Sequence, residues 1–290
     1  MADESNEDRE PLLSVRDLTV EFGSFRAVEG VSFDLYPGET LAIVGESGSG
    51  KSVTALSIMR LIELGTRGRI TNGRIVLNLP GEEATDLVEE PEERLRSIRG
   101  SVISMIFQEP LTALNPVYSI GNQISEAVRA HQDASKADAA EMALEMLRKV
   151  RIPEPEKRIK QYPHEMSGGM RQRVMIAQAL VLNPQVLICD EPTTALDVTI
   201  QAQILRLIDD LQQDTGAAVI MITHDMGVVA EIADRVVVMK SSRVVEQGSV
   251  EQIFADPQED YTKALLAAVP RLGSMNDRDE PAKFDLVEGP

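Results

Sequence analysis

Runs of hydrophobic and polar residues divide the first part of the chain into strands and one helix. Residues 13–22 alternate between apolar and polar side chains, as a half-buried strand does. Residues 31–35 and the apolar run at 41–44 predict two more strands, which Pro37 and Gly38 join through a turn. Residues 53–60 have the spacing of an amphipathic helix, so the pattern predicts strands followed by a helix.

The middle of the chain changes character. Residues 74–79 and 101–107 predict strands, and the strongly acidic stretch 82–93 between them indicates a solvated insertion or a surface helix. Helical patterns then dominate residues 109–166, chiefly at 120–131 and 136–150, and several prolines break them. This segment is expected to form a small helical subdomain inserted into an α/β core.

The last part of the chain returns to alternating strands and helices. Helices are predicted at 167–182, 201–213 and 261–269, and strands at 185–190, 217–223, 235–239 and 243–247. Residues 1–11 and 271–290 are polar and are expected to form a disordered arm and a disordered tail. Between them, strands that alternate with helices indicate an α/β protein.

One glycine-rich stretch lies between a predicted buried strand and a predicted helix. It consists of Gly45, Glu46, Ser47, Gly48, Ser49, Gly50, Lys51 and Ser52. This is the pattern G-x-x-x-x-G-K-[ST], in which backbone N–H groups surround a phosphate chain. The following helix N-terminus adds partial positive charge, Lys51 would reach the β- and γ-phosphates, and the Ser52 hydroxyl would bind Mg²⁺. We therefore predict a site for ATP and Mg²⁺, in preference to a chance glycine-rich turn.

A pair of acids follows the apolar strand predicted at 185–190. The strand ends in Asp190, and Glu191 comes next. Both side chains would lie at the carboxyl edge of a sheet, where such sheets bind their ligands. In a phosphate-loop ATPase Asp190 would hold Mg²⁺, and Glu191 would orient or deprotonate the attacking water. A simple strand end has the same pattern, so the prediction depends on the loop that begins at Gly45.

The charge balance argues against one class of partner. The 290 residues include 29 Lys and Arg and 47 Asp and Glu, which gives a net charge of −18. Binding to nucleic acid normally requires clustered basic residues, so no nucleic-acid partner is expected. Solubility is the simpler explanation of the acidity. Hydrophobic residues make up 43% of the chain, which is enough for a sizeable core.

Cysteine content and hydropathy indicate a compartment. Cys189 is the one cysteine, so no disulfide can form within the chain, as is usual in a reducing compartment. The acidic N-terminus is unlike a signal peptide. No apolar stretch approaches the roughly 20 residues that span a bilayer. The protein is expected to be cytosolic, with any membrane contact made through a partner.

Further short motifs surround these two sites. Gln108 ends the strand 101–107, Met166-Ser167-Gly168-Gly169-Met170 opens the helix 167–182, Ala195-Leu196-Asp197 follows the acid pair, His224 follows the strand 217–223, and Phe22 ends the first strand. In this order the motifs resemble the nucleotide-binding subunits of ABC transporters, over about residues 12–270. The usual signature in that family begins Leu-Ser-Gly-Gly-Gln, so Met166 and Met170 depart from it.

The resemblance implies a role for each motif. Ser167, Gly168 and Gly169 would contact the γ-phosphate held by a second subunit, and Asp197 would signal across the dimer. Gln108 would sense Mg²⁺ and water, and His224 would contact the γ-phosphate and align the water. Phe22 would stack on adenine, with Phe25 as the alternative. Catalysis would therefore use Glu191, His224, Gln108 and Lys51, and Mg²⁺ would be held by Ser52, Gln108 and Asp190.

The resemblance also implies a fold and a set of partners. The fold would be α/β: a P-loop NTPase core of the RecA-like type, with an antiparallel β subdomain and an inserted α-helical subdomain at about 109–166. The cassette would span 12–270, and each chain would hold half of each active site. The expected partners are a second ATP-binding subunit, identical or a sister chain, and two transmembrane permease subunits. A solute-binding protein, periplasmic or extracellular, would act through the permease.

Three longer stretches narrow the resemblance. Residues 108–116, 162–173 and 261–266 are similar to the peptide/opine/nickel group of importers, which includes the dipeptide and oligopeptide systems. The expected function is ATP hydrolysis coupled to uptake of peptides or related small solutes, at the cytoplasmic face of the inner membrane. Many members carry a C-terminal cysteine cluster suited to an iron–sulfur site. Cys189 is the only cysteine here, so no such cluster can form.

The sequence also allows other interpretations. A soluble ABC ATPase of DNA repair or translation usually has two cassettes, a long coiled coil or a basic surface, and this sequence shows none of these. An exporter or lipid-release cassette is disfavoured by the residues after Gln108. A non-catalytic partner subunit is disfavoured by Glu191 and His224. The sequence also fits a fragment of a fused chain with two cassettes.

Overall fold

An antiparallel sheet forms one part of the computed structural model, which describes residues 9–64, 66–194 and 197–268. Its strands are β1 (Leu13–Phe22), β2 (Phe25–Leu35), β4 (Gly68–Leu77) and β5 (Thr85–Asp86). They run in the order β2-β1-β4-β5, and each neighbouring pair is antiparallel. Strand β2 begins earlier than predicted because Gly30, at φ 63°, interrupts its alternation without ending it.

The second sheet is mostly parallel. Its strands are β3 (Thr40–Val44), β6 (Ile103–Ile106), β7 (Val186–Asp190), β8 (Ala218–Thr223), β9 (Arg235–Lys240) and β10 (Arg243–Ser249). They are ordered β10-β9-β3-β8-β7-β6, and only the β10–β9 pair is antiparallel. Every residue of β3, β7 and β8 is buried, which explains why these strands are continuous apolar runs in the sequence.

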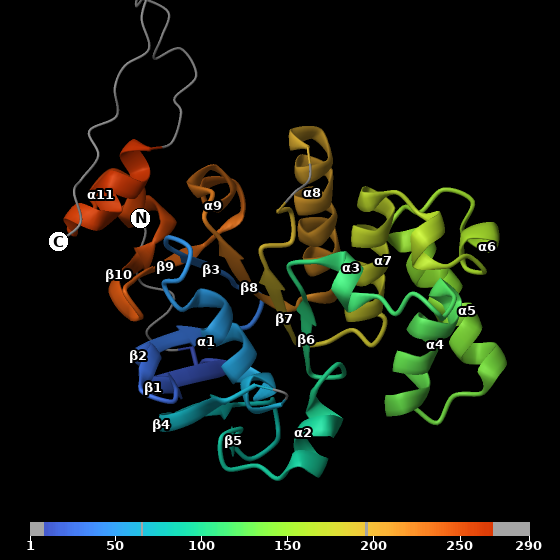
Figure 1. Ribbon diagram of the computed structural model, residues 1–290, viewed down its shortest axis with the longest axis horizontal. Coiled ribbons are helices and arrows are strands. Elements are labelled where there is room, and N and C mark those ends of the chain that lie inside the picture. The colour runs from blue at the N-terminus through green and yellow to red at the C-terminus, as the bar shows by residue number, and fades with distance from the viewer. Residues whose placement is uncertain (1–8, 65, 195–196, 269–290) are drawn as a thin grey trace, which may run out of the picture.

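Helices cover the sheets and fill the segment between β6 and β7. They are α1 (Lys51–Ile58), α2 (Glu92–Ile98), α3 (Pro110–Ala113), α4 (Ile120–His131), α5 (Lys136–Lys149), α6 (Pro155–Arg158), α7 (Gly168–Leu180), α8 (Val198–Thr215), α9 (Met226–Ile232), α10 (Val250–Ala255) and α11 (Asp260–Ala267), with 3-10 turns at η1 (Leu61–Glu63) and η2 (Pro163–Glu165). Figure 1 shows α4 to α7 grouped at the right and the antiparallel sheet at the lower left, with β6, β7 and β8 between them and β9 and β10 above the antiparallel sheet.

The segment between β6 and α7 is helical, as predicted from its periodicity. Helix α4 has the predicted bounds, and α5 ends one residue before the predicted end. Ser119 and Ser135 start these helices by accepting hydrogen bonds from the backbone N–H groups of Asn122 and Asp138. The acidic stretch 82–93 contains β5, and the surface helix considered there begins only at Glu92.

Two hydrophobic clusters divide the core on the two faces of the parallel sheet. One joins α1 and the antiparallel sheet to residues such as Ile43 and Ile188, and the other joins α4, α5, α7 and α8 to Leu187 and Cys189. Neighbouring residues of a strand point to opposite faces, so Leu187 and Ile188 belong to different clusters. A third cluster joins α9, α10 and α11 to β3 and β9. Within the described ranges, no helix is long and apolar enough to cross a bilayer.

The predicted arm and tail lie outside the described residues, apart from residues 9–11. The same holds for Ala195 and Leu196 of the motif that ends at Asp197.

We predict that the Cys189 thiol does not react in the folded protein. The residue is fully buried in β7, and burial raises the pKa of its thiol. Both the reactive thiolate and the access of reagent are therefore suppressed. An Ellman assay should give negligible signal in buffer and one thiol per chain in denaturant, with free glutathione as the reagent control. Rapid labelling in buffer would show that this face of the sheet is open.

Candidate functional site

Four neighbouring strands deliver the predicted site residues to one edge of the parallel sheet. The parallel register pairs Val44 of β3 with Thr223 of β8, and Ile222 of β8 with Asp190 of β7. Strand β6 pairs with β7 up to Ile106, two residues before Gln108. The phosphate loop, His224, the acid pair and Gln108 therefore all follow the carboxyl ends of adjacent strands. This is the edge at which open α/β sheets bind ligands.

The phosphate loop has a shape that only glycine permits at its two ends. Gly45 has φ 149°, and a Cβ there would lie 2.1 Å from the carbonyl oxygen of Met239. Gly50 has φ 103°, and its Cβ would lie 2.6 Å from the carbonyl oxygen of Ala27. Any larger residue would push the loop away from strands β9 and β2. The glycines thus allow the close packing that sets the shape of the loop.

Lys51 is folded back onto the loop that it follows. Its Nζ donates to the carbonyl oxygens of Gly45 at 2.7 Å and Glu46 at 2.8 Å. The residue is 5% exposed, and burial lowers the pKa of the ammonium group although Glu191, Asp190 and Glu46 oppose this. A buried ammonium is stabilised by negative charge, so the position suits a phosphate.

Asp190 and Ser52 form a second polar contact, which is partly buried. The Ser52 hydroxyl donates to Oδ1 of Asp190 at 2.8 Å. Burial raises the pKa of the Asp190 carboxyl, the bond from Ser52 lowers it, and the charge of Glu191 raises it further. A hydroxyl oxygen beside a buried carboxylate is a suitable donor pair for a hard cation.

Glu191 is the centre of a hydrogen-bond network. Its Oε2 accepts from Nε2 of Gln108 at 2.9 Å and from the Thr194 hydroxyl at 2.9 Å. Its Oε1 lies 3.4 Å from Nδ1 of His224. The structure therefore brings together Gln108, Glu191 and His224, which lie far apart in the sequence. Thr194 was not among the predicted site residues. Its position three residues after Glu191 is the one feature of the sequence that could have indicated it.

The backbone holds Glu191 and His224 close to each other at the ends of neighbouring strands. Glu191 has φ 44°, a conformation that is costly for a residue with a side chain, and its N–H donates to the Ile222 carbonyl at 3.0 Å. His224 lies between β8 and α9, and Asp225 caps α9 by accepting from the N–H groups of Gly227 and Val228. The His224 side chain is 63% exposed, so its ring faces solvent at the edge of the site.

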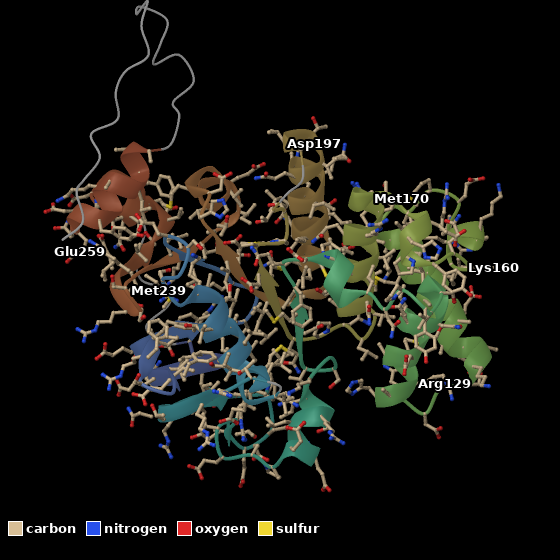
Figure 2. The ribbon with its side chains drawn as sticks, in the orientation of Figure 1. Arg129, Lys160, Met170, Asp197, Met239 and Glu259 are labelled. Atoms are coloured by element: carbon tan, nitrogen blue, oxygen red, sulfur yellow. The ribbon has the colours of Figure 1, made fainter. Side chains whose placement is uncertain are left out.

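The signature residues lie in another part of the chain. The Ser167 hydroxyl caps α7 by accepting from the Met170 N–H, and both Ser167 and Gly168 are exposed. Figure 2 shows Met170 on the side of the helical group and Met239, which packs under the phosphate loop, on the opposite side. Met166 is 4% exposed in the helical core, so this departure from the family pattern keeps an apolar side chain there.

Two further predicted residues have structural roles in the chain itself. Asp197 caps α8, because its side chain accepts from the Ile200 N–H at 2.9 Å, and it remains exposed. Phe22 is partly buried, and a Cβ at Gly68 would lie 2.9 Å from its ring. Phe25 is 63% exposed. The signalling role of Asp197 and the adenine contact of Phe22 stay predictions.

The residues present fit a nucleotide with Mg²⁺. Gly50 gives α1 no side-chain cap, so the first backbone N–H groups of the helix are available to an anion. The Ser49 hydroxyl is buried and has no hydrogen-bond partner. Lys51 and Asp190 are buried ions whose pKa shifts both favour the neutral form. Phosphate and a divalent cation would supply the missing opposite charges.

Comparison with known proteins identifies the family. Residues 28–194, more than half of the chain, match the family model described as ABC transporter. The chain belongs to this family. The curated relatives include the glutathione import ATP-binding protein GsiA of Escherichia coli O1:K1 / APEC, which is 55% identical over 284 residues, covering 97% of this chain and 45% of that protein. The same protein of Escherichia coli strain K12 is 55% identical over 280 residues, covering 95% and 45%. The chain spans about half the length of these curated relatives.

Solved structures confirm the predicted fold class. The ATP-binding cassette MJ0796, in a dimeric post-hydrolysis state bound to ADP and Pi, is 26% identical with a TM-score of 0.71, covering 82% of this chain and 98% of that chain. The protein cbiO1 of Clostridium perfringens, part of the ABC transporter complex cbiONQ, is 28% identical with a TM-score of 0.70, covering 85% and 92%. The P-loop NTPase core is thus shared with ATP-binding cassettes.

Replacement of Asp190 by asparagine should stabilise the nucleotide-free protein at neutral pH. Because the pKa of Asp190 is raised in the folded state, chiefly by burial, its ionisation costs folding free energy. The cost is complete above the raised pKa and absent below the usual aspartate range. Asp190→Asn should therefore melt a few degrees above the parent chain at pH 7, by circular dichroism, and the gap should narrow on acidification.

A matched control is available on the surface. Asp214 is exposed on α8, so Asp214→Asn should leave the melting temperature close to that of the parent at each pH. If Asp190→Asn melted at the same temperature as the parent at pH 7, the claim that ionised Asp190 destabilises the fold would be wrong. The same would follow if the difference in melting temperature widened on acidification.

Proposed function

We propose that this chain is the ATP-hydrolysing subunit of an ABC importer, which couples ATP binding and hydrolysis to the uptake of peptides or related small solutes. The observation that carries the proposal is the position of Glu191. Its carboxylate lies at the sheet edge beside the phosphate loop and contacts Gln108, Thr194 and His224. Membership of the ABC transporter family supports this use of the site.

The chain's own residues would divide the binding of Mg²⁺·ATP among them. The amides of the loop Gly45–Ser52 and Lys51 would hold the phosphates, and Ser52, Asp190 and Gln108 would hold Mg²⁺. The cation would neutralise charge on the phosphate oxygens. Phe22 would stack on adenine. Most of the rate would come from positioning and from charge already in place, because phosphoryl transfer needs little covalent help from the protein.

Glu191 would act as the base, with Lys51, Gln108 and His224 as the other catalytic residues. The Gln108 amide and the Thr194 hydroxyl both donate to Oε2, which fixes the carboxylate plane. Oε1 faces His224 and would accept the proton of the attacking water. His224 would contact the γ-phosphate and align that water. Catalytic hydrogen bonds are often long without substrate, so the 3.4 Å separation to His224 suits this role.

A second ATP-binding cassette would complete each site. Ser167, which caps α7, and Gly168 and Gly169, which begin it, lie at a helix N-terminus, a favourable place for an anion. Figure 1 shows α7 apart from α1, which follows the loop, with strands of the parallel sheet between them. These three residues would therefore contact the γ-phosphate bound by a partner, identical or a sister chain, and Asp197 would communicate across that interface. The dimeric state of the related cassette bound to ADP and Pi supports this arrangement.

Exposed hydrophobic residues next to Gln108 fit contact with a permease. Phe107, Val117 and Tyr118 are 39%, 71% and 50% exposed, and all lie between β6 and α4. The segment 109–120 would hold a cytoplasmic helix of one of two transmembrane permease subunits. A solute-binding protein would deliver solute to the permease. The chain would then lie at the cytoplasmic face of the inner membrane, attached through these subunits.

The relatives favour import over the rival functions. Proteins described as glutathione import ATP-binding proteins are 55% identical to this chain over nearly its whole length. Glutathione is a small peptide, so this likeness agrees with peptide-like cargo. It argues against a soluble ATPase of DNA repair or translation, and against an exporter-type cassette. The net charge of −18 likewise argues against nucleic acid.

Glu191→Gln should keep ATP binding and lose turnover. Glutamine preserves the shape of the side chain but cannot accept the proton, so the rate of phosphate release should fall about 100-fold or more. ATP should then accumulate in a dimer that is visible by size-exclusion chromatography. Glu93→Gln, on the exposed face of α2, is the control and should hydrolyse ATP at the parent rate. A full rate for Glu191→Gln would remove Glu191 from its role.

Lys51→Ala should lose nucleotide affinity. Among the described residues Lys51 is the only buried cation, so alanine removes the charge that is expected to meet the phosphates. Isothermal titration with ATP should show at least about tenfold weaker binding. Lys160→Ala, at the far end of the helical group in Figure 2, should bind like the parent. Equal affinities for the two variants would refute the phosphate contact.

A further inference from the structure

The C-terminal part of the chain contacts the phosphate loop at three points. The Met239 carbonyl lies under Gly45, and the Ser242 N–H donates to the Ser49 carbonyl at 3.2 Å. The third contact comes from α11, where the Tyr261 hydroxyl accepts from the Glu46 N–H at 2.9 Å. The three C-terminal residues in these contacts, Met239, Ser242 and Tyr261, all follow the region that matches the ABC transporter model, which ends at residue 194.

The Tyr261 contact involves the same peptide group that binds Lys51. The peptide between Gly45 and Glu46 presents its carbonyl to Nζ of Lys51 at 2.7 Å and its N–H to Tyr261 at 2.9 Å. A peptide group is planar, so its two polar ends turn together. Tyr261 therefore limits the rotation of the group on which Lys51 rests. If Lys51 leaves the carbonyl for a phosphate, the Tyr261 bond still holds the peptide in place.

Helix α11 is fixed well enough for Tyr261 to act as a support. The Glu246 carboxylate of β10 accepts from the N–H groups of Gln258 and Glu259 just before the helix, at 2.7 and 3.1 Å. Leu265 and Leu266 pack against the cluster that contains Val44, the last residue before the loop. Figure 2 shows Glu259 and Met239 on the same side of the molecule.

The Tyr261 ring is held as well as its hydroxyl. Nζ of Lys240, the last residue of β9, lies 5.0 Å from the centre of the ring. A cation at this distance from an aromatic face is attracted to it. The ring is partly buried in the same cluster as Leu265. Ring, hydroxyl and helix thus form one unit, with few alternative positions for the hydroxyl.

We propose that Tyr261 is a positioning residue for the phosphate-binding loop, through which α11 sets the affinity of the loop for the phosphates of a nucleotide. The inference rests on the proposed nucleotide-binding function and gives a role at the nucleotide to α11, for which the sequence predicted no contact with a nucleotide. It acts through preorganisation: the loop keeps its binding shape before the ligand arrives. Coupling between two sites is reciprocal: if α11 raises the affinity of the loop for a nucleotide, a bound nucleotide must in turn stabilise α11.

The test compares Tyr261→Phe with a tyrosine elsewhere. Tyr261→Phe removes the hydroxyl and leaves the ring, the Lys240 contact and the packing of α11 in place. Loss of one neutral hydrogen bond should weaken ADP binding about two- to tenfold by isothermal titration. Tyr36→Phe, at the other end of β3 from the loop, should leave ADP affinity unchanged. Steady-state ATP turnover should show the loss in KM with little change in kcat.

Hydrogen exchange, measured on the full parent chain and on Tyr261→Phe, gives a second test. ADP should slow amide exchange in residues 260–267, and Tyr261→Phe should abolish most of that protection. A structural anchor would lower the melting temperature of Tyr261→Phe while the ADP affinity and the exchange response stayed at the parent values. That result would overturn the inference. Absence of ADP binding by the parent chain would instead overturn the proposed function, so the two failures are distinguishable.

Discussion

The site depends on burying two opposite charges at the edge of a sheet whose central strands are mostly apolar. Lys51 and Asp190 are 5% and 6% exposed, and burial shifts the pKa of each toward the neutral form. Contacts within the chain compensate only in part: carbonyl oxygens accept from Lys51, and Ser52 donates to Asp190. The fold therefore stores unfavourable charge where a ligand with both phosphate and a cation would relieve it.

Buried elements were the part of the fold that the sequence could predict. Strands β3, β7 and β8 lie between two hydrophobic clusters, so each must be apolar on both faces, and their runs are visible in the sequence. Helices α4 and α5 are long enough for their periodicity to show. Short α9 and α10 were missed because their limits depend on caps rather than on periodicity. Ser249 and Gln252 form a capping box that could have located α10.

The site residues also fall into those that the sequence could identify and those that it could not. The phosphate loop and the acid pair were recognisable because their residues are close together in the sequence. Gln108 and His224 needed the order of several motifs, and the structure supplies the reason: their strands are neighbours of β7 in the sheet. Residues 261–266 showed only a likeness to the importer group, and nothing in the sequence paired Tyr261 with Glu46, which lies 215 residues away. Contacts of this kind depend on the packing of whole elements, which no local pattern reports.

Glu191 connects the proposed chemistry to three separate segments of the chain. Gln108 leads into the helical group, Thr194 precedes α8, and His224 precedes α9. Hydrogen bonds to a charged carboxylate are stronger than those to a neutral carboxyl. If Glu191 accepts a proton, the contacts from Gln108, Thr194 and His224 weaken in the same event. Under the proposed function, a single protonation would then weaken three contacts together, and it would connect hydrolysis at the sheet edge to the surfaces that partners would contact.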